Sequence, residues 1–336
     1  MNQIFRKMRF LLREINTLRS KSGPYRFLVR KWDSISDIDL ALRVLETEFF
    51  VKELKPLPLP LEKIKSILVI APHQDDETIG AGGTLLLAAE MGVKIDVIFA
   101  TDGTSKEDKN TSLPDNIVEI RQKEGRKVCA EFGATVHQLS IYNAEPNPSL
   151  KDLDQFSDII HSVKPQVVLM PWVLDSPPKH RLINHLLWLM NERKPLPDFE
   201  VWGYQVHNTL FPNGYVDITS VAEEKRKLLE YYASQNELSK RYDHLAMGMA
   251  AWNTRFFNFT EPKYVELFFT LPLKELLRLI ERFYFTDLPE TYRGHELVIS
   301  GATNIHQAVM NKAAGNGSHS ITKENDGNKQ FAAKNS

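Results

Sequence analysis

The stretch Ser66–Gly83 reads SILVIAPHQDDETIGAGG, and its character changes at Pro72. The apolar run before Pro72 has the length and the aliphatic composition of a buried strand. The residues from Glu77 onward predict a helix, and a group of ionisable side chains lies between the two elements. Ligands of α/β sheets bind beyond the carboxyl ends of the strands, so we expect the chemistry of this protein at that turn.

The same alternation of short apolar runs and longer helical segments continues along the chain. The predicted strands are 66–71, 94–100, 135–139 and 166–170, and the predicted helices are 77–91, 116–132 and 153–163. Gly133 follows the second helix, as is typical of a helix C-terminus. This order predicts a Rossmann-like α/β fold, in which a mostly parallel sheet carries helices on both faces.

The composition is that of a globular protein, and it excludes several classes of protein. The chain has 336 residues, of which 42% are hydrophobic and 25% are charged, and its formal net charge is −1. No apolar run reaches the roughly 20 residues that span a bilayer. The near-neutral charge lacks the signature of a nucleic-acid-binding protein. The single cysteine, Cys129, cannot form an internal disulfide, which fits a cytoplasmic protein.

Two end segments differ from the central part, which we expect to be one catalytic domain over residues 61–300. In the extension 1–60, a basic segment with an apolar stripe at helical spacing covers residues 1–30, and the alternating prolines of KPLPLP predict a stiff linker. The basic segment is interpreted as a helix packed on the domain or as one lying on anionic lipid at the inner face of a membrane. Residues 301–336 are rich in Asn, Gly, Ser and Lys and predict a disordered tail.

The turn after the first predicted strand carries side chains suited to a metal ion. One carboxylate would suffice to cap the next helix, which leaves a histidine and a second acid unexplained. His73 and Asp76 can both bind one cation, while Asp75 between them stays free as a base. A mononuclear catalytic zinc needs three protein ligands and an open position for water. His180, which follows the strand 166–170, is the candidate third ligand.

The hexapeptide Pro72–Glu77, PHQDDE, resembles the PHxDDE signature of the PIG-L family, the LmbE-like zinc-dependent deacetylases of N-acetylglucosamine conjugates. Further similarities lie in Thr101–Gly103, in Arg121 with Glu124, in Ser234–Gln235 and in Tyr264–Phe268. The resemblance implies that Zn²⁺ is held by His73, Asp76 and His180, that Asp75 is the general base, and that Arg121 contacts an N-acetylated sugar. In the implied reaction, zinc activates water and polarises the acetamide carbonyl, and Asp75 carries the proton to the leaving amine.

One motif departs from the family pattern. The family's second motif usually reads HPDH, whereas Pro177–His180 reads PPKH here, so the ligand position is present but the oxyanion histidine and its acid partner are replaced. Loss of one preorganised oxyanion donor costs about 3–4 kcal/mol of transition-state stabilisation. We therefore expect compensation, with His207 as the candidate catalytic residue and Tyr204 and Lys179 as further candidates. Tyr204 is also a candidate substrate-binding residue, through ring stacking on a sugar.

The same residues are also compatible with other functions. Two histidines and one carboxylate also hold the iron of non-haem oxygenases, and paired acids serve phosphoesterases with two metals. The replaced HPDH residues also allow a carbohydrate-binding or scaffold protein without catalysis. Among the sugar substrates, the basic segment 1–30 favours a lipid-linked glycan. The sequence identifies neither the sugar nor the oligomeric state.

Overall fold

The computed structural model describes residues 43–47, 49, 55–104, 116–143, 148–175, 178–236, 241–284 and 309. The basic segment 1–30 and nearly all of the tail 301–336 lie outside this part of the chain. Within it, every strand and helix predicted above is present, with ends that differ from the prediction by three residues or fewer.

An eight-stranded sheet forms the centre of the molecule, in the order β1-β7-β8-β6-β5-β2-β3-β4. The neighbouring strands β6, β5, β2, β3 and β4 run parallel, and β8 is antiparallel to β6 and β7. The strands are β1 (Leu57–Pro58), β2 (Ser66–Ala71), β3 (Lys94–Thr101), β4 (Thr135–Ile141), β5 (Val167–Pro171), β6 (Glu200–Tyr204), β7 (Gly214–Asp217) and β8 (Val265–Pro272). The predicted α/β fold with a mostly parallel sheet is confirmed.

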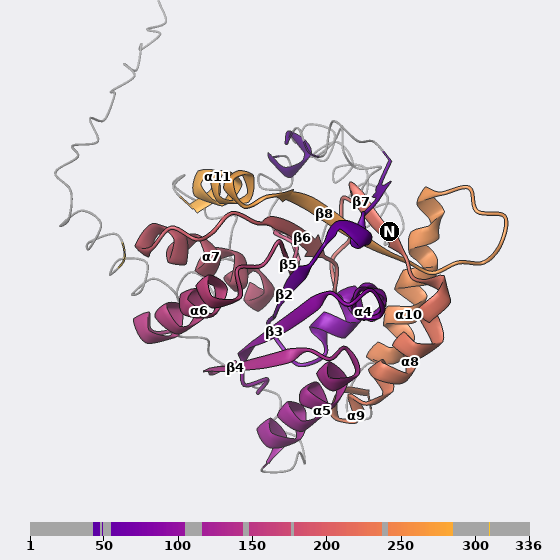
Figure 1. Ribbon diagram of the computed structural model, residues 1–336, viewed down its shortest axis with the longest axis horizontal. Helices are drawn as coiled ribbons and strands as arrows, with labels where there is room; N and C mark the ends of the chain where they lie inside the picture. Colours follow the sequence, from indigo (N-terminus) through magenta and orange to yellow (C-terminus); the bar gives the residue numbers. More distant parts are fainter. Residues whose placement is uncertain are drawn as a thin grey trace, which may run out of the picture.

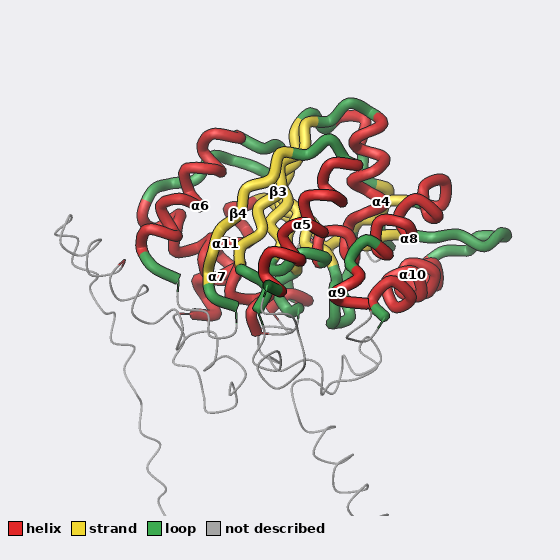
Figure 2. Tube along the Cα trace, turned by 90° about the horizontal axis from the view of Figure 1, so that it is seen from below, coloured by secondary structure: helices red, strands yellow, loops and turns green. Residues whose placement is uncertain are grey.

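Helices cover both faces of this sheet (Figure 1). The view in Figure 2 separates α6, α7 and α11 from α4, α5, α8 and α10, with the sheet between the two groups. The helices are α4 (Asp76–Glu90), α5 (Ile117–Glu131), α6 (Leu150–Val163), α7 (Pro178–Arg193), α8 (Ala222–Glu230), α9 (Ala233–Asn236), α10 (Tyr242–Trp252) and α11 (Leu273–Tyr284). Each helical layer packs its own apolar core against the sheet.

The aliphatic run of β2 follows from its central place in the sheet. Leu68 and Ile70 pack in the core under α6 and α7, while Ile67 and Val69 pack in the core under α4. Successive side chains of a strand point to opposite faces, so a parallel strand covered on both faces has to be apolar at every position.

The glycines of α4 allow close packing. A Cβ atom on Gly80 would lie 2.2 Å from the ring of Tyr204, and one on Gly83 would lie 2.7 Å from Ile218. The absence of these two side chains lets α4 lie directly on Tyr204 and Ile218.

Two segments expected to lie outside the domain contribute residues to it. Leu57 and Pro58, in the expected linker, pair with Gly214 and Tyr215 of β7, because proline is tolerated in an edge strand whose outer side needs no N–H donor. Val309, in the tail expected to be disordered, is buried in the core beside α7 and α11. The structured domain therefore draws on both of these segments.

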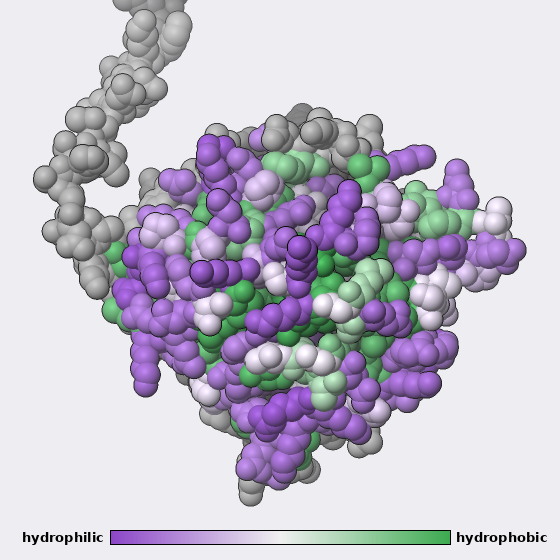
Figure 3. Space-filling view, in the orientation of Figure 1, coloured by the Kyte–Doolittle hydropathy of each residue, from purple (hydrophilic) through white to green (hydrophobic). Residues whose placement is uncertain are grey.

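The visible surface is mostly hydrophilic, with apolar residues in small separate patches (Figure 3). Among the residues that the structure describes, no helix combines the length and the apolar character needed to cross a bilayer.

Candidate metal centre

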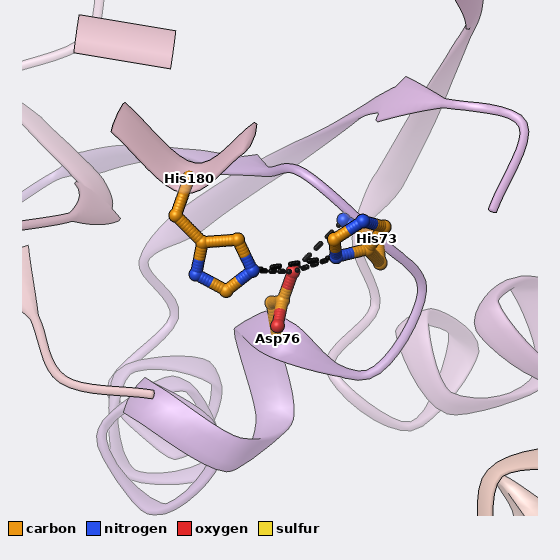
Figure 4. A group of neighbouring side chains, drawn as sticks. All are labelled: His73, Asp76 and His180. Atoms are coloured by element: carbon orange, nitrogen blue, oxygen red, sulfur yellow. Dashed lines mark hydrogen bonds and ion pairs between the residues drawn. The ribbon is translucent and has the colours of Figure 1, made fainter. Parts of the chain in front are cut away.

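The site lies where the order of the strands reverses. The chain runs outward from β2 through β3 to β4 and then returns to the other side of β2 as β5. A crevice forms beyond the carboxyl ends of two such strands. His73 and Asp76 follow β2, and His180 lies in the first turn of α7 after β5, so the three side chains meet beyond the ends of these two adjacent strands (Figure 4).

The three predicted ligands converge through one atom each. Nδ1 of His73 lies 2.9 Å from Oδ2 of Asp76, and Nε2 of His180 lies 3.3 Å from the same oxygen. The two ring nitrogens are 3.4 Å apart. Ligand atoms of a tetrahedral zinc with bonds of about 2.0–2.1 Å lie about 3.3 Å from one another. Both the donor types and their separations therefore fit a zinc ion.

Burial and the charges of neighbouring groups shift the pKa values of these three side chains. Burial alone would raise the pKa of Asp76, but the adjacent rings of His180 and His73 outweigh it and lower that pKa. Burial lowers the pKa of His73. Burial also acts to lower the pKa of His180, but the carboxylates of Asp76 and Asp175 overcome it and raise that pKa. The centre thus holds a buried anion between two rings, which is an arrangement that a divalent cation stabilises.

Asp75 lies beside the ligands in a strained backbone conformation. Its φ angle is 134°, although it is not glycine, and its backbone N–H donates to Oε2 of Glu77 over 3.1 Å. Glu77 is itself held by hydrogen bonds from the hydroxyls of Thr78 and Tyr232. Burial, and then the charge of Asp76, raise the pKa of the Asp75 carboxyl group. A raised pKa suits a group that first accepts and then returns a proton.

Two residues that the sequence analysis missed orient the ligand rings. Oδ1 of Asn143 lies 2.9 Å from Nε2 of His73, and Oδ2 of Asp175 lies 3.0 Å from Nδ1 of His180. Each ring therefore directs its other nitrogen toward the centre, as metal-binding histidines generally do. Both residues follow the carboxyl end of a predicted strand, and this position in the sequence could have marked them as candidate site residues.

The Thr101–Gly103 motif supports His73 indirectly. Oδ1 of Asp102 accepts hydrogen bonds from the backbone N–H of Thr104 and from that of Asn143, each over 3.0 Å. The side-chain amide of Asn143 donates to the carbonyl oxygen of Thr104 over 2.5 Å. The ends of β3 and β4 are thereby joined, and Asn143 is held where it meets the ring of His73.

His207 stands at the rim of the centre. Its ring centroid lies 5.3 Å from that of His180 and 5.8 Å from that of Tyr242, and its side chain is exposed. Lys179 is half-buried in the first turn of α7. Pro177 lies outside the described residues. Among the residues expected to replace the oxyanion histidine, His207 has an exposed side chain and a ring that lies beside that of His180.

Arg121 and Glu124 join α5 to the short helix α9. Arg121 donates to the carbonyl oxygen of Gly103 and, over 2.9 Å, to Oε1 of Gln235. Glu124 accepts hydrogen bonds from the backbone N–H and the hydroxyl of Ser234, over 2.9 and 2.6 Å. The two motifs that resemble the family, Arg121 with Glu124 and Ser234–Gln235, are therefore in direct contact although they are far apart in the sequence. The positive charge of Arg121 also acts to lower the pKa of Asp75 and so opposes the effect of burial.

Tyr204 does not reach the open side of the site. The residue is completely buried, its hydroxyl donates to the carbonyl oxygen of Ile70 over 3.1 Å, and its ring fills the space above Gly80. A sugar ring therefore has no surface of Tyr204 on which to stack, because α4 already covers it.

A comparison with protein families matches residues 68–190 to the model described as PIG-L: GlcNAc-PI de-N-acetylase. The matched segment begins in β2, ends in α7 and contains His73, Asp75, Asp76 and His180. It includes the PHQDDE stretch on which the resemblance was based.

The relatives found by sequence and by structure include deacetylases and a hydratase. The diacetylchitobiose deacetylase of Thermococcus kodakarensis is 28% identical over 193 residues, which are 52% of this chain and 72% of the relative. The 4-oxalmesaconate hydratase of Pseudomonas putida is 25% identical over 203 residues, which are 54% of this chain and 79% of the relative. The structure of N,N'-diacetylchitobiose deacetylase from Pyrococcus horikoshii superposes with a TM-score of 0.53 and 23% identity, covering 75% of this chain and 98% of the other. At 23% identity, this superposition shows that the two chains share a fold.

Proposed function

We propose that this protein is a zinc-dependent hydrolase that removes the N-acetyl group from an amino sugar and releases acetate and a free amine. The observation that carries the proposal is the convergence of His73, Asp76 and His180 with the buried carboxyl group of Asp75 beside them. The PIG-L match over this segment and the diacetylchitobiose deacetylase relative support the choice of substrate class.

We assign each residue a role from the chemistry that its side chain can supply. A zinc ion bound by the three ligands would activate a water molecule and polarise the amide carbonyl. Asp75 accepts the proton of the attacking water and returns it to the nitrogen as the C–N bond breaks. His207, at the rim beside His180, donates a hydrogen bond to the oxygen that becomes negative in the transition state.

Arg121 shapes the substrate side of the site. Its guanidinium group is held between Gly103 and Gln235, and its charge faces Asp75. We assign it to a hydroxyl or phosphate oxygen of the substrate, because a guanidinium group recognises oxygen pairs in a fixed geometry.

The first experiment combines metal analysis with acetate release from a panel of N-acetylated sugars. Wild-type protein should hold about one zinc per chain, as expected for a site with three protein ligands and an open position. The His180→Ala variant should lose both the metal and the activity. His161→Ala is the matched control, because His161 lies near the end of α6, before β5 begins, and its ring contacts Ser157 and the Pro195 carbonyl.

The alternatives correspond to distinct outcomes of this experiment. Bound zinc and bound sugar without acetate release would indicate a carbohydrate-binding or scaffold protein. Bound iron would indicate oxidative chemistry, and two metals per chain would indicate a phosphoesterase. The lipid-linked substrate is tested separately, by comparing acetate release from lipid-linked and free N-acetylated sugars. The membrane contact is tested by the binding of anionic liposomes to the protein with and without residues 1–30, and unchanged binding after the deletion would count against it.

A second candidate function is the addition of water to a carbon–carbon double bond, which the similarity to the 4-oxalmesaconate hydratase favours. A base beside a metal site serves this reaction as well, because an activated water also adds to an unsaturated carboxylate. The two candidates are separated by following acetate release with sugars and loss of ultraviolet absorbance with 4-oxalmesaconate.

A further inference from the structure

Asp175 is a buried carboxylate that belongs to none of the predicted site motifs. It lies in the turn after β5 and is completely buried. Its backbone is fixed by a hydrogen bond from its N–H to the carbonyl oxygen of Trp172 over 2.9 Å. The side-chain amide of Asn208 holds the same turn through the carbonyl oxygen of Leu174, also over 2.9 Å.

Both carboxylate oxygens of Asp175 are occupied. Oδ2 lies 3.0 Å from Nδ1 of His180 and accepts the backbone N–H of Val206 over 3.2 Å. Oδ1 accepts the backbone N–H groups of His207 and Asn208 over 3.0 and 2.8 Å. One side chain therefore contacts a metal ligand and also the loop that carries His207.

The contact with His180 determines which ring nitrogen is free. An ionised carboxylate only accepts hydrogen bonds, so Nδ1 of His180 has to carry the hydrogen. Nε2, which lies 3.3 Å from Oδ2 of Asp76, is then the ring nitrogen that can bind a metal ion. A partner of this kind also raises the basicity of the ligating nitrogen.

The contacts with residues 206–208 determine where the ring of His207 lies. These residues leave the end of β6, and their three N–H groups all point at Asp175. The ring of His207 is consequently held 5.3 Å from the ring of His180. If the three N–H groups lost this acceptor, the loop would be free to move away from the centre.

We propose that Asp175 is the positioning residue of the site, which fixes the zinc-binding tautomer of His180 and the place of His207 at the same time. It supplies a carboxylate where the second motif of this chain has Lys179 in place of an acid. The inference rests on the proposed function for the identity of the metal and for the role of His207.

The variant Asp175→Asn tests the tautomer directly. An amide has one acceptor oxygen and one NH₂ group, so in one orientation the NH₂ group faces Nδ1 of His180 and drives its hydrogen onto Nε2. In the other orientation the NH₂ group meets the N–H groups of His207 and Asn208. Both orientations should weaken zinc binding, by about 10- to 100-fold.

Zinc affinity is measured by competition with a chromophoric chelator, and the tautomer by long-range ¹H–¹⁵N spectra of the histidine rings in the zinc-bound protein without substrate. In wild-type protein, His180 should carry its hydrogen on Nδ1. The Asn variant should lose this signal in the first orientation of the amide and shift the signals of the His207 ring in the second. His207→Ala keeps the backbone N–H, so it should bind zinc normally and lose only the rate of acetate release.

Asp217→Asn is the matched control, because Asp217 also anchors a turn through its carboxylate but lies at the end of β7, outside the centre. An Nε2–H tautomer of His180 in the wild type would overturn the proposal even if the Asn variant did not fold. Zinc binding by Asp175→Asn as tight as that of the wild type would also overturn it. Because these measurements need no substrate, a wrong assignment of the deacetylase reaction would not affect them.

Discussion

At the scale of single residues, the backbone of Asp75 is held in a conformation that L-amino acids rarely adopt. Its φ of 134° occurs at the N-terminus of α4, and the surrounding hydrogen bonds hold it there through Glu77. Such strain costs of order 1–3 kcal/mol and is found where function requires a fixed side chain. Here the strained turn places the carboxyl group of Asp75 next to Asp76 without letting it join the ligand set.

Replacement of Asp75 should therefore separate stability from activity. Asp75→Gly should raise the free energy of unfolding of the metal-free protein by about 1 kcal/mol, because glycine adopts positive φ freely. The same variant should lose acetate release by about 10²- to 10⁴-fold, because the base is gone. Urea unfolding and initial rates measure the two effects. Asp75→Asn should also lose the rate, and it should gain less stability than Asp75→Gly, because it removes the buried charge but keeps the side chain at positive φ. A Gly variant no more stable than the Asn variant would contradict the assignment of strain.

At the scale of elements, α4 determines the position of the centre because its first turn carries Asp76. The helix has two unusual features. Its glycines bring it into contact with Tyr204 and Ile218. The carboxylate of Glu266 accepts the N–H groups of Gly83 and Thr84, each over 2.8 Å, and so binds the middle of the helix to β8.

The contact of Gly80 with Tyr204 predicts a penalty for even the smallest side chain. In Gly80→Ala, the new methyl group would overlap the ring of Tyr204, which should lower the free energy of unfolding by about 1–3 kcal/mol. Gly248→Ala is the matched control on α10, because nothing lies within 4 Å of the position of its Cβ. That variant should be neutral or more stable, by up to about 1 kcal/mol. Equal effects in the two variants, measured by urea unfolding, would contradict the packing role of Gly80.

A second prediction concerns the buried ion pair of Lys225 and Glu266, because both side chains bind the backbone of α4. Nζ of Lys225 lies 2.7 Å from Oε1 of Glu266 and 2.9 Å from the carbonyl oxygen of Ile79, and both side chains are buried. Lys225→Met leaves the carboxylate buried without its counter-charge, which should destabilise the protein by about 3–5 kcal/mol.

The double variant Lys225→Met/Glu266→Gln checks this reasoning. It removes both charges but keeps an acceptor for the helix N–H groups, so it should be more stable than Lys225→Met alone in urea unfolding. A double variant less stable than the single one would show that the cost does not come from an unpaired charge.

At the scale of the whole molecule, the metal centre joins two βα units that are separated along the chain. His73 and Asp76 come from the β2–α4 unit and His180 from the β5–α7 unit. A bound ion therefore links the two units across the crevice, and any ligand that binds only the folded state stabilises that state.

Removal of the metal should lower the thermal stability of the protein. Zinc at about 100 times its dissociation constant adds about 2.7 kcal/mol to the free energy of unfolding, which corresponds to a rise in Tm of several degrees for a domain of this size. Scanning calorimetry with a chelator, followed by addition of zinc, measures the loss and its recovery. The Tm of His180→Ala should not respond to either treatment, and an equal response of that variant would place the stabilising ion elsewhere.

Some properties of this protein follow from the sequence by itself. The apolar run of β2, the helix after it and the polar turn between them are decided by interactions within a few residues, so hydrophobic periodicity and spacing are enough to predict them. The assignment of His73 and Asp76 as partners is also local, because the first turn of α4 brings them together.

The position of His180 after a predicted strand made it a candidate ligand, but only the tertiary structure decided that it meets His73 and Asp76 and which other distant residues support the centre. The alternation of strands and helices does not state on which side of β2 the strand β5 lies, and that choice brings His180, Asp175 and His207 to the same crevice. Likewise, the packing of α9 on α5 unites Ser234 with Glu124, and the covering of β6 by α4 buries Tyr204. The physical reason is that strand order and helix packing depend on the burial of the whole core, whereas a sequence pattern reports only on the neighbours along the chain.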